Sequence, residues 1–251
     1  MDIDKLLFRC HSIGDLMGVK GLGETGKKRA RYTYVEAKYG RRKSVKSKYF
    51  DKGIACEPLS FELTKSVLGL DLVKNHERKE NEFLTGECDT ESEELNLVAD
   101  IKNCWDIYTF SDACSKLNTD NENQLRCYME LFDRDNSKLI YTLNNATDEL
   151  VLKALESESY NHHERETPEW IEVEIIKDMI FTTSEFERFI NIRGLGGDEL
   201  TDRCIETFIE IPENDRVFVY DFKRDETRYD LIKSRIKEAR AYLKNLYNKA
   251  E

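Results

Sequence analysis

Residues 86–102 read GECDTESEELNLVADIK, and this stretch decides the fold. Two runs of strand-forming residues, 82–89 and 95–105, flank the acidic turn 90–94, so we expect an antiparallel hairpin. Side chains two positions apart on a strand share one face, which places Asp100 beside Lys102. The hairpin turn brings Asp89, at the end of the first run, back toward Asp100. Two carboxylates and one ammonium group are therefore expected to converge.

Helical patterns precede and follow this hairpin. Residues 54–68 have apolar side chains mostly at helical spacing, contain Glu57, and are followed by Gly69 as a helix stop. After the hairpin, residues 123–132 form a helical pattern in which Gln124 and Tyr128 share one face. A compact strand-like run, 138–143, comes next. The expected order is helix, hairpin, helix, strand.

The C-terminal part of the chain predicts helices and one further strand. We expect a charged helix over 147–165, a helical stretch over 184–192, a strand over 216–222 and a long amphipathic helix over 225–247. These closing elements indicate an α/β fold. No catalytic pattern stands out between 147 and 215.

The converging side chains suit phosphate chemistry with a hard metal ion. Mg²⁺ prefers carboxylate and carbonyl oxygens and keeps several waters, and a lysine can orient an attacking water. Asp89 and Asp100 would supply the carboxylates, and Glu57 a further oxygen. Gln124 and Tyr128 can each bond a phosphate oxygen. The alternative is a solvated strand face with a simple ion pair, or an ordinary half-buried tyrosine and a surface amide.

Charge is unevenly distributed along the chain. The 251 residues include 39 Lys and Arg against 50 Asp and Glu, a net charge of −11. Residues 20–48 contain eleven basic and two acidic side chains, so this arm has a charge of +9. Such an arm favours contact with nucleic-acid phosphates, although a solvated charged helix is the alternative. The expected DNA-binding residues of the arm are Lys27, Lys28, Arg29, Arg31, Arg41, Arg42 and Lys43.

Several other signals are set aside. Residues 21–26 (GLGETG) match a dinucleotide-binding glycine pattern, and with Lys27 a phosphate loop, but no apolar strand precedes them. His162 and His163 point about 100° apart on a helix among polar neighbours, so we expect them in solvent rather than on a metal. Seven cysteines without a C-x-x-C pair indicate reduced, mostly buried thiols. No apolar run predicts a membrane span and no leader or lipidation motif is present, which favours the cytoplasm.

Four motifs together resemble the PD-(D/E)xK nuclease superfamily, and within it the RecB-like and viral recombination exonucleases of the YqaJ or lambda exonuclease type. Residues 52–57 (KGIACE) are similar to the helix that ends in the family's glutamate, and 86–89 (GECD) to its G-x-x-D strand end. Residues 100–102 (DIK) are similar to (D/E)-x-K, and 124–128 (QLRCY) to Q-x-x-x-Y. The order and spacing fit a restriction-endonuclease-like core with a central mixed sheet flanked by helices, in the order αβββαβ.

The resemblance implies an activity and a set of site residues. It implies a Mg²⁺-dependent DNA exonuclease, with Mn²⁺ as a substitute, in which Asp89, Asp100, the Ile101 carbonyl and Glu57 hold the metal. Lys102 would position the attacking water, while Gln124 and Tyr128 orient the scissile strand. An N-terminal Arg and Ser help hold a 5′-phosphate in the lambda type, and Arg9 and Ser12 lie where they would fall. Only Cys204 follows Cys127, so we expect no iron–sulfur cluster.

The resemblance also implies a biological setting and an organisation of the chain. Linear duplex ends in phage or prophage recombination are the expected substrate, with a single-strand annealing protein as partner and a homo-oligomer as assembly. We expect one nuclease domain over 1–251, with the basic arm 20–48, a catalytic core 50–143 and an extension 144–251. A structure-specific endonuclease on the same core and a non-catalytic DNA-binding protein remain as alternatives.

Overall fold

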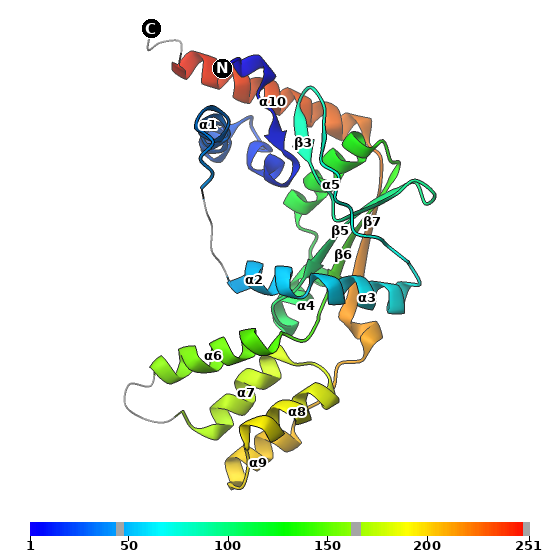
Figure 1. Ribbon diagram of the computed structural model, residues 1–251. Coiled ribbons are helices and arrows are strands. Elements are labelled where there is room, and N and C mark those ends of the chain that lie inside the picture. Colours follow the sequence, from blue (N-terminus) through cyan, green and yellow to red (C-terminus); the bar gives the residue numbers. More distant parts are fainter. Residues whose placement is uncertain (44–47, 162–166, 248–251) are drawn as a thin grey trace.

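A computed structural model describes residues 1–43, 48–161 and 167–247 (Figure 1). The strands are β1 (Phe8–Arg9), β2 (Lys79–Glu80), β3 (Leu84–Gly86), β4 (Thr90–Ser92), β5 (Leu97–Asn103), β6 (Asn136–Thr142) and β7 (Val217–Lys223). The helices of the N-terminal half are η1 (Ile3–Lys5), η2 (Cys10–Leu16), α1 (Gly23–Tyr39), α2 (Lys48–Ala55), α3 (Glu57–Leu68), α4 (Ile107–Ser115) and α5 (Thr119–Phe132). Those of the C-terminal half are α6 (Asp148–Asn161), α7 (Glu169–Met179), α8 (Thr183–Arg193), α9 (Glu199–Glu206), η3 (Glu213–Arg216) and α10 (Glu226–Tyr247).

The strands form two mixed sheets. The larger sheet has the order β4-β5-β6-β7, in which β5 and β6 are parallel and the outer pairs are antiparallel. The smaller sheet has the order β1-β3-β2. The alternating run that predicts a strand over 216–222 is thus the edge strand β7 of the larger sheet. The strand expected over 138–143 is β6, which lies in the middle of this sheet.

The hairpin that contains Asp100 and Lys102 differs in detail from the expected one. Residues 90–92, expected in the turn, form the strand β4 that pairs with β5, while the expected strand 82–89 shortens to β3 and joins the other sheet. Asn96 reverses the chain with a left-handed φ of 46°. Thr90 pairs with Ala99, so Asp89 lies one residue beyond the strand, opposite Asp100. Asp89 therefore faces Asp100 as expected, because the register of the hairpin is the same although the strand boundaries differ.

Two predicted segments are organised differently. The single helix expected over 54–68 is broken at Cys56 into α2 and α3, and Glu57 is the first residue of α3. Gly69 ends α3 in the left-handed conformation, with φ at 66°, as expected of a helix stop. The described part of the basic arm is mainly the helix α1, which buries Ala30 and Tyr34 against the protein instead of extending as a free arm.

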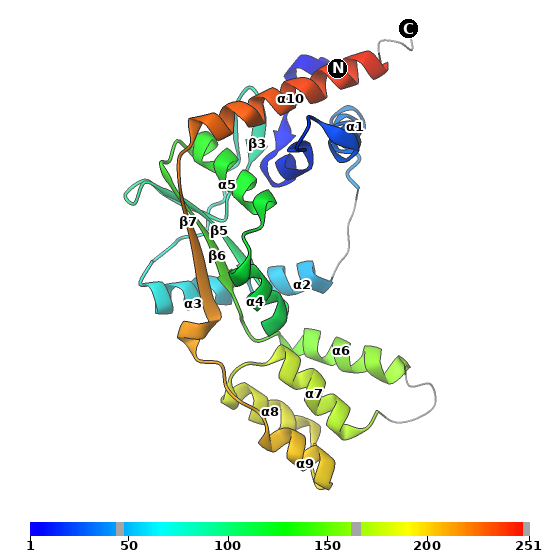
Figure 2. The ribbon, with the colours of Figure 1, turned by 180° about the vertical axis from the view of Figure 1, so that it is seen from behind.

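Hydrophobic packing divides into a central core and a helical lobe. The main core lies between η2, α5, α10 and the sheets, and it contains Phe8, Leu84, Leu139 and Ile236. A second core joins α6, α7 and α8 through Val151, Ile176 and other apolar residues. Figures 1 and 2 both show α6 to α9 gathered at one end of the sheet, with α1 and α10 at the other end. We call α6 to α9 the helical lobe.

Two further expectations concern cysteines and membranes. All seven cysteines are free thiols and five of them are buried, as the lack of a pairing pattern predicts. Within the described ranges, none of the helices combines the length and the apolar character that a membrane crossing needs. The expected exposure of His162 and His163 concerns positions that lie outside the described residues.

Candidate active site

The (D/E)-x-K side chains meet on one face of β5. Lys102 Nζ lies 2.7 Å from Asp100 Oδ2, which confirms that the two side chains share a face. The Asp100 side chain is 2% exposed, whereas that of Lys102 is 37% exposed, so the lysine extends from a buried carboxylate toward solvent. Asp89 Oδ2 accepts a hydrogen bond of 2.7 Å from the Ile101 backbone N–H. This bond holds the second carboxylate against the same strand.

The helix α5 covers the buried end of this group. Gln124 Nε2 donates to Asp100 Oδ1 at 3.1 Å and to the Tyr128 hydroxyl at 2.9 Å. Gln124 therefore orients Asp100 and does not project freely toward a substrate. Tyr128 is 4% exposed, and burial together with the charge of Asp100 raises its pKa above the usual range. Its phenol stays protonated and retains a proton to donate.

Gly86 of the G-x-x-D motif is required by this packing. A Cβ at Gly86 would lie 2.9 Å from Tyr128 Cε1 and 2.5 Å from Cys10 Sγ. Both distances are shorter than a Cβ atom keeps from atoms to which it is not bonded. The absence of a side chain thus lets β3 lie directly against the tyrosine of α5. The close packing explains why the first position of this motif is glycine in this chain.

Electrostatics couple the charged groups. Burial raises the pKa of Asp89 to about 7, and the charge of Asp100 adds to the effect. Burial alone would lower the pKa of Lys102, but the charges of Asp100 and Asp89 outweigh it and raise that pKa. At neutral pH Lys102 is therefore an ammonium group, while Asp89 is near the middle of its titration.

Glu57 lies near this group but has a different partner. Its carboxylate pairs with Lys74 Nζ, and its negative charge contributes to the raised pKa of Asp89. Within the part of the chain that the structure describes, no three His, Cys, Asp or Glu side chains are arranged as a metal-binding group. A cation here would rely on two carboxylates supplemented by carbonyl oxygen and water.

The residues nevertheless fit a divalent cation. Asp100 Oδ2 is buried, and its partner is the Lys102 ammonium, 2.7 Å away. A cation that binds this oxygen would share it with the Lys102 ammonium or displace that group toward solvent, where the lysine side chain is already 37% exposed. Two carboxylates with retained waters are the ligand set that Mg²⁺ commonly uses. Asp89, Asp100 and the Ile101 carbonyl between Asp100 and Lys102 are the residues that would hold it.

The expected DNA-binding residues of the N-terminal region have mixed environments. Arg9 Nη2 pairs with Glu36 at 2.5 Å, and the Ser12 hydroxyl donates to the Arg9 carbonyl at 2.9 Å. Ser12 is 6% exposed, so its hydroxyl belongs to the turn of η2. Partial desolvation and nearby cations, Arg42 first among them, lower the pKa of His11 to about 4. Lys102 contributes to this effect, which places the N-terminal segment near that lysine.

Several arm residues attach α1 to the protein. Arg29 Nε lies 2.6 Å from Asp15 Oδ2, and Arg31 Nη1 donates to the Tyr242 hydroxyl of α10 at 2.6 Å. Lys27 pairs with Glu24 at 2.7 Å on the helix surface. Arg29 and Arg31 thus have structural partners, a role that the charge pattern did not reveal.

The remaining cations of the arm face solvent. Arg41, Arg42 and Lys43 are exposed after the end of α1, and Lys43 Nζ lies 5.6 Å from the centre of the Tyr32 ring. Lys28 Nζ lies over the same ring, at 5.8 Å. These four cations and Tyr32 form a mixed basic and aromatic surface that can accept phosphates and bases.

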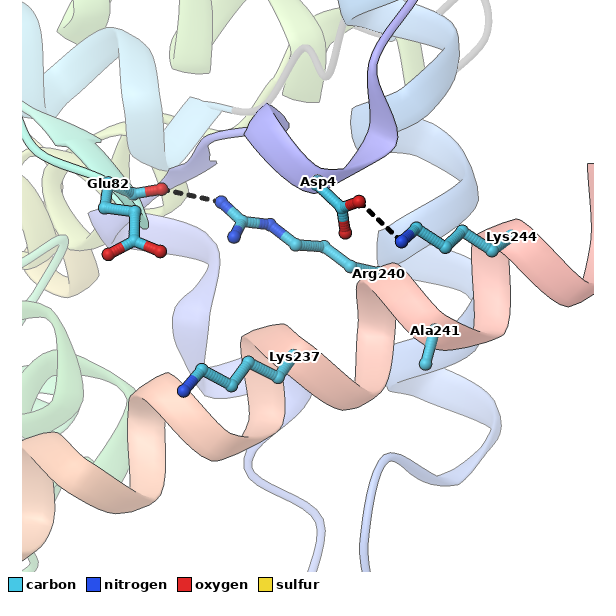
Figure 3. Close-up of a pocket in the computed structure, with 6 residues that line it drawn as sticks. All are labelled: Asp4, Glu82, Lys237, Arg240, Ala241 and Lys244. Atoms are coloured by element: carbon cyan, nitrogen blue, oxygen red, sulfur yellow. Dashed lines mark hydrogen bonds and ion pairs between the residues drawn. The ribbon is translucent and has the colours of Figure 1, made fainter.

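A pocket on α10 lies apart from this site (Figure 3). Its volume is about 340 Å³, and its lining includes Asp4, Glu82, Lys237, Arg240 and Lys244. Arg240 donates to the Glu82 carbonyl at 2.6 Å, and Lys244 pairs with Asp4 at 2.5 Å (Figure 3). These contacts attach α10 to the N-terminal segment and to the turn between β2 and β3. The polar side chains that line the pocket therefore hold these elements together.

Solved structures identify the architecture. A phage-related exonuclease from Haemophilus somnus 129PT matches with a TM-score of 0.68 and 23% identity, over 98% of this chain and 97% of that chain. The alkaline exonuclease LHK-Exo from Laribacter hongkongensis matches with a TM-score of 0.60 and 10% identity, over 98% and 94% of the two chains. The same enzyme in complex with dAMP gives 0.55 and 11%, over 99% and 97%. This chain has the exonuclease fold.

The exonuclease fold covers nearly the whole chain, including the helical lobe and α10. The expected α/β core with mixed sheets flanked by helices is therefore confirmed, as is the structural resemblance to phage and alkaline exonucleases. No family model and no curated protein sequence matches the chain. The similarity to known proteins is thus one of structure, at 23% sequence identity or less.

Proposed function

We propose that the protein is a divalent-metal-dependent DNA exonuclease that hydrolyses phosphodiester bonds at the ends of linear duplex DNA. The observation that carries the proposal is the convergence of Asp100 and Lys102 of β5 with Asp89, which is bonded to the Ile101 N–H. This group lies within a fold shared with a phage-related and an alkaline exonuclease, one of them solved with dAMP. Mg²⁺ is the proposed cofactor, with Mn²⁺ as a substitute.

Each side chain has a defined part in the proposed reaction. Asp89 and Asp100 would hold the cation together with the Ile101 carbonyl, and Glu57 would contribute directly or through water. When bound, the cation lowers the pKa of a water and neutralises charge that develops on the phosphate. Lys102, an ammonium group at neutral pH, orients the attacking water by donating a hydrogen bond to it.

The helix α5 prepares the site for the substrate. Gln124 holds Asp100 in one orientation through a hydrogen bond from its amide. Both protons of Nε2 are already donated, one to Asp100 and one to Tyr128, so neither is available to a substrate. Tyr128, kept neutral by its raised pKa, would donate its proton toward the scissile phosphate. The exposed cations Arg41, Arg42, Lys43 and Lys28 would hold the DNA backbone. Arg9 would join them from its pair with Glu36, while the buried Ser12 would support the turn that carries Arg9. Contacts of this kind carry no base information, so cleavage should be independent of sequence and sensitive to salt.

The proposed setting is phage or prophage recombination in the host cytoplasm. One of the structural neighbours is called a phage-related exonuclease, which supports this setting. An exonuclease that exposes single strands would supply the substrate for an annealing protein, which is the proposed partner. A homo-oligomer around the DNA is the proposed assembly.

Degradation of end-labelled DNA tests the proposal. Linear duplexes with 5′-phosphate or 5′-hydroxyl ends, and covalently closed circles, are incubated with the protein in Mg²⁺, Mn²⁺ or EDTA. We expect metal-dependent loss of the linear DNA and survival of the circles. Cut circles would indicate an endonuclease, and DNA binding without cleavage in either metal would overturn the catalytic assignment.

An isosteric variant shows whether the site is responsible. Asp100→Asn should lower the rate at least about 100-fold while DNA binding, measured by fluorescence anisotropy, changes little. The matched control is Asp221→Asn, because Asp221 also pairs with a lysine, at 2.5 Å, but is 69% exposed on β7. Equal effects of the two variants would contradict the assignment of Asp100.

A further inference from the structure

A largely buried polar cluster adjoins Lys102 of the candidate active site. Asn144 Nδ2 donates to Ser60 Oγ at 2.9 Å and to Asn103 Oδ1 at 2.9 Å. The Thr142 hydroxyl also donates to Ser60 Oγ, at 2.9 Å, and Ser60 in turn donates to the Cys56 carbonyl at 3.0 Å. We call Ser60, Asn103, Thr142 and Asn144 the polar clamp.

Three of the four clamp residues are buried, and Asn103 is partly exposed. Ser60 is 1% exposed, Thr142 0% and Asn144 5%. Asn103 Oδ1 accepts from both the side chain and the backbone N–H of Asn144, the latter at 3.1 Å. Such bonds contribute little to net stability, and apolar side chains of similar shape can be as stable. Unlike apolar contacts, however, these bonds permit only one relative placement of the elements they join.

The elements joined are those that bear the catalytic residues. Ser60 lies one helical turn after Glu57 on α3, and Asn103 directly follows Lys102 on β5. Thr142 pairs with Asn103 in the ladder between β5 and β6, and Asn144 follows β6. Apolar contacts, through Phe61 and Leu68 among others, also hold α3 against the sheet. Such contacts do not fix the position of the helix along the strands.

We propose that the polar clamp is a positioning device that sets Glu57 of α3 relative to Asp100 and Lys102 of β5. The inference rests on the proposed nuclease function and adds to it residues that touch neither metal nor substrate. Without the clamp, α3 can slide or rotate on the sheet while remaining packed. Small displacements of this kind change the ligand geometry and the orientation of the attacking water.

The experiment compares two clamp variants with two matched controls. Ser60→Ala and Asn144→Ala remove clamp bonds. Thr64→Val removes a buried bond of 2.7 Å within α3, to the Ser60 carbonyl, and leaves the link to the sheet intact. Asn145→Ala removes bonds from the neighbouring residue to Thr182 and Phe181 in the helical lobe. The melting temperature of each variant measures the structural cost.

The readouts are steady-state cleavage of linear duplex DNA and Mn²⁺ affinity measured by calorimetry or electron paramagnetic resonance. We expect each clamp variant to lower kcat about 10-fold, with KM for DNA within about twofold, and to weaken Mn²⁺ binding several-fold. The Ser60→Ala/Asn144→Ala double variant should also lose about 10-fold, and not about 100-fold, because the two residues share one bond. Thr64→Val and Asn145→Ala should keep kcat and Mn²⁺ affinity within about twofold at a similar loss of melting temperature.

The two proposals fail in different ways. Clamp variants that lose only melting temperature, in parallel with Thr64→Val, would overturn the positioning role even if the wild type degrades DNA. A wild type that binds Mn²⁺ but cuts no DNA would overturn the proposed nuclease function. The Mn²⁺ affinities of the clamp variants would then be the readout that tests the positioning role. A wild type that does neither would overturn both.

Discussion

Removing the charge of Asp89 should stabilise the protein while abolishing its chemistry. Burial and the neighbouring Asp100 raise the pKa of Asp89 from 3.8 to about 7. In Asp89→Asn the amide oxygen can still accept the 2.7 Å bond from the Ile101 N–H, so the local geometry is retained. What disappears is a partly buried negative charge that faces a second one.

The sign and size of the effect follow from proton linkage. Below pH 3.8 the carboxyl is protonated in both the folded and the unfolded chain, and the charge costs nothing. As pH rises from 3.8 through about 7, the unfolded chain loses the proton first, so stability falls progressively. At about 1.4 kcal/mol per pH unit, the upper limit is about 4 kcal/mol above pH 7. Because Asp89 keeps some contact with solvent, about half of this limit is expected.

Thermal unfolding of the metal-free protein in EDTA measures the difference. For a chain of this size, about 2 kcal/mol corresponds to a rise in melting temperature of about 4–8 °C. Asp89→Asn should show this rise at about pH 8, a smaller one at about pH 5, and none near pH 4. Mg²⁺ should stabilise the wild type above pH 7 and leave the variant unchanged, since a ligand stabilises only the state that binds it. A variant that melts at or below the wild-type temperature at pH 8 would refute the electrostatic reasoning.

Three other perturbations test separate features of the site. Gly86→Ala places a Cβ 2.9 Å from Tyr128 Cε1 and should cost about 1–3 kcal/mol in chemical unfolding, with lowered activity; an unchanged unfolding midpoint would contradict this packing. Lys74→Ala removes the cation paired with Glu57 and should lower the Mg²⁺ concentration for half-maximal cleavage by up to about fivefold, whereas a higher requirement would mean that Lys74 supports the metal site. Arg41→Ala should weaken DNA binding and reduce the slope of log Kd against log salt by about 1, and an unaltered slope would remove Arg41 from the DNA contact surface.

The catalytic strand could be predicted because its geometry depends on short-range rules. Asp100 and Lys102 share a face whatever the strand's exact ends, since the period of a strand is two. Asp89 was placed correctly even though β4 occupies the expected turn, because Thr90 pairs with Ala99 and keeps Asp89 opposite Asp100. Errors of a few residues in strand boundaries therefore did not alter which side chains meet.

Partners chosen by tertiary packing could not be predicted in this way. Lysine is almost always exposed, yet Lys52 is 1% exposed and donates to the Trp105 carbonyl at 2.7 Å. Burial lowers the pKa of Lys52 to about 8. Ser60 and Asn144 likewise look like surface residues in a linear sequence. Their burial depends on how α3 crosses the sheet, and no local pattern encodes that crossing.

The distribution of charge gains meaning only when it is placed on the fold. Residues 144–215, which include the helical lobe, contain 19 acidic and six basic side chains, a net charge of −13, so the rest of the chain is slightly positive. The lobe lies at the end of the sheet away from α1 and α10 (Figure 2). An overall charge of −11 is therefore compatible with a DNA substrate, because the repulsive part is separated from the exposed cations near α1. The acidic lobe would also disfavour binding of DNA at that end of the sheet.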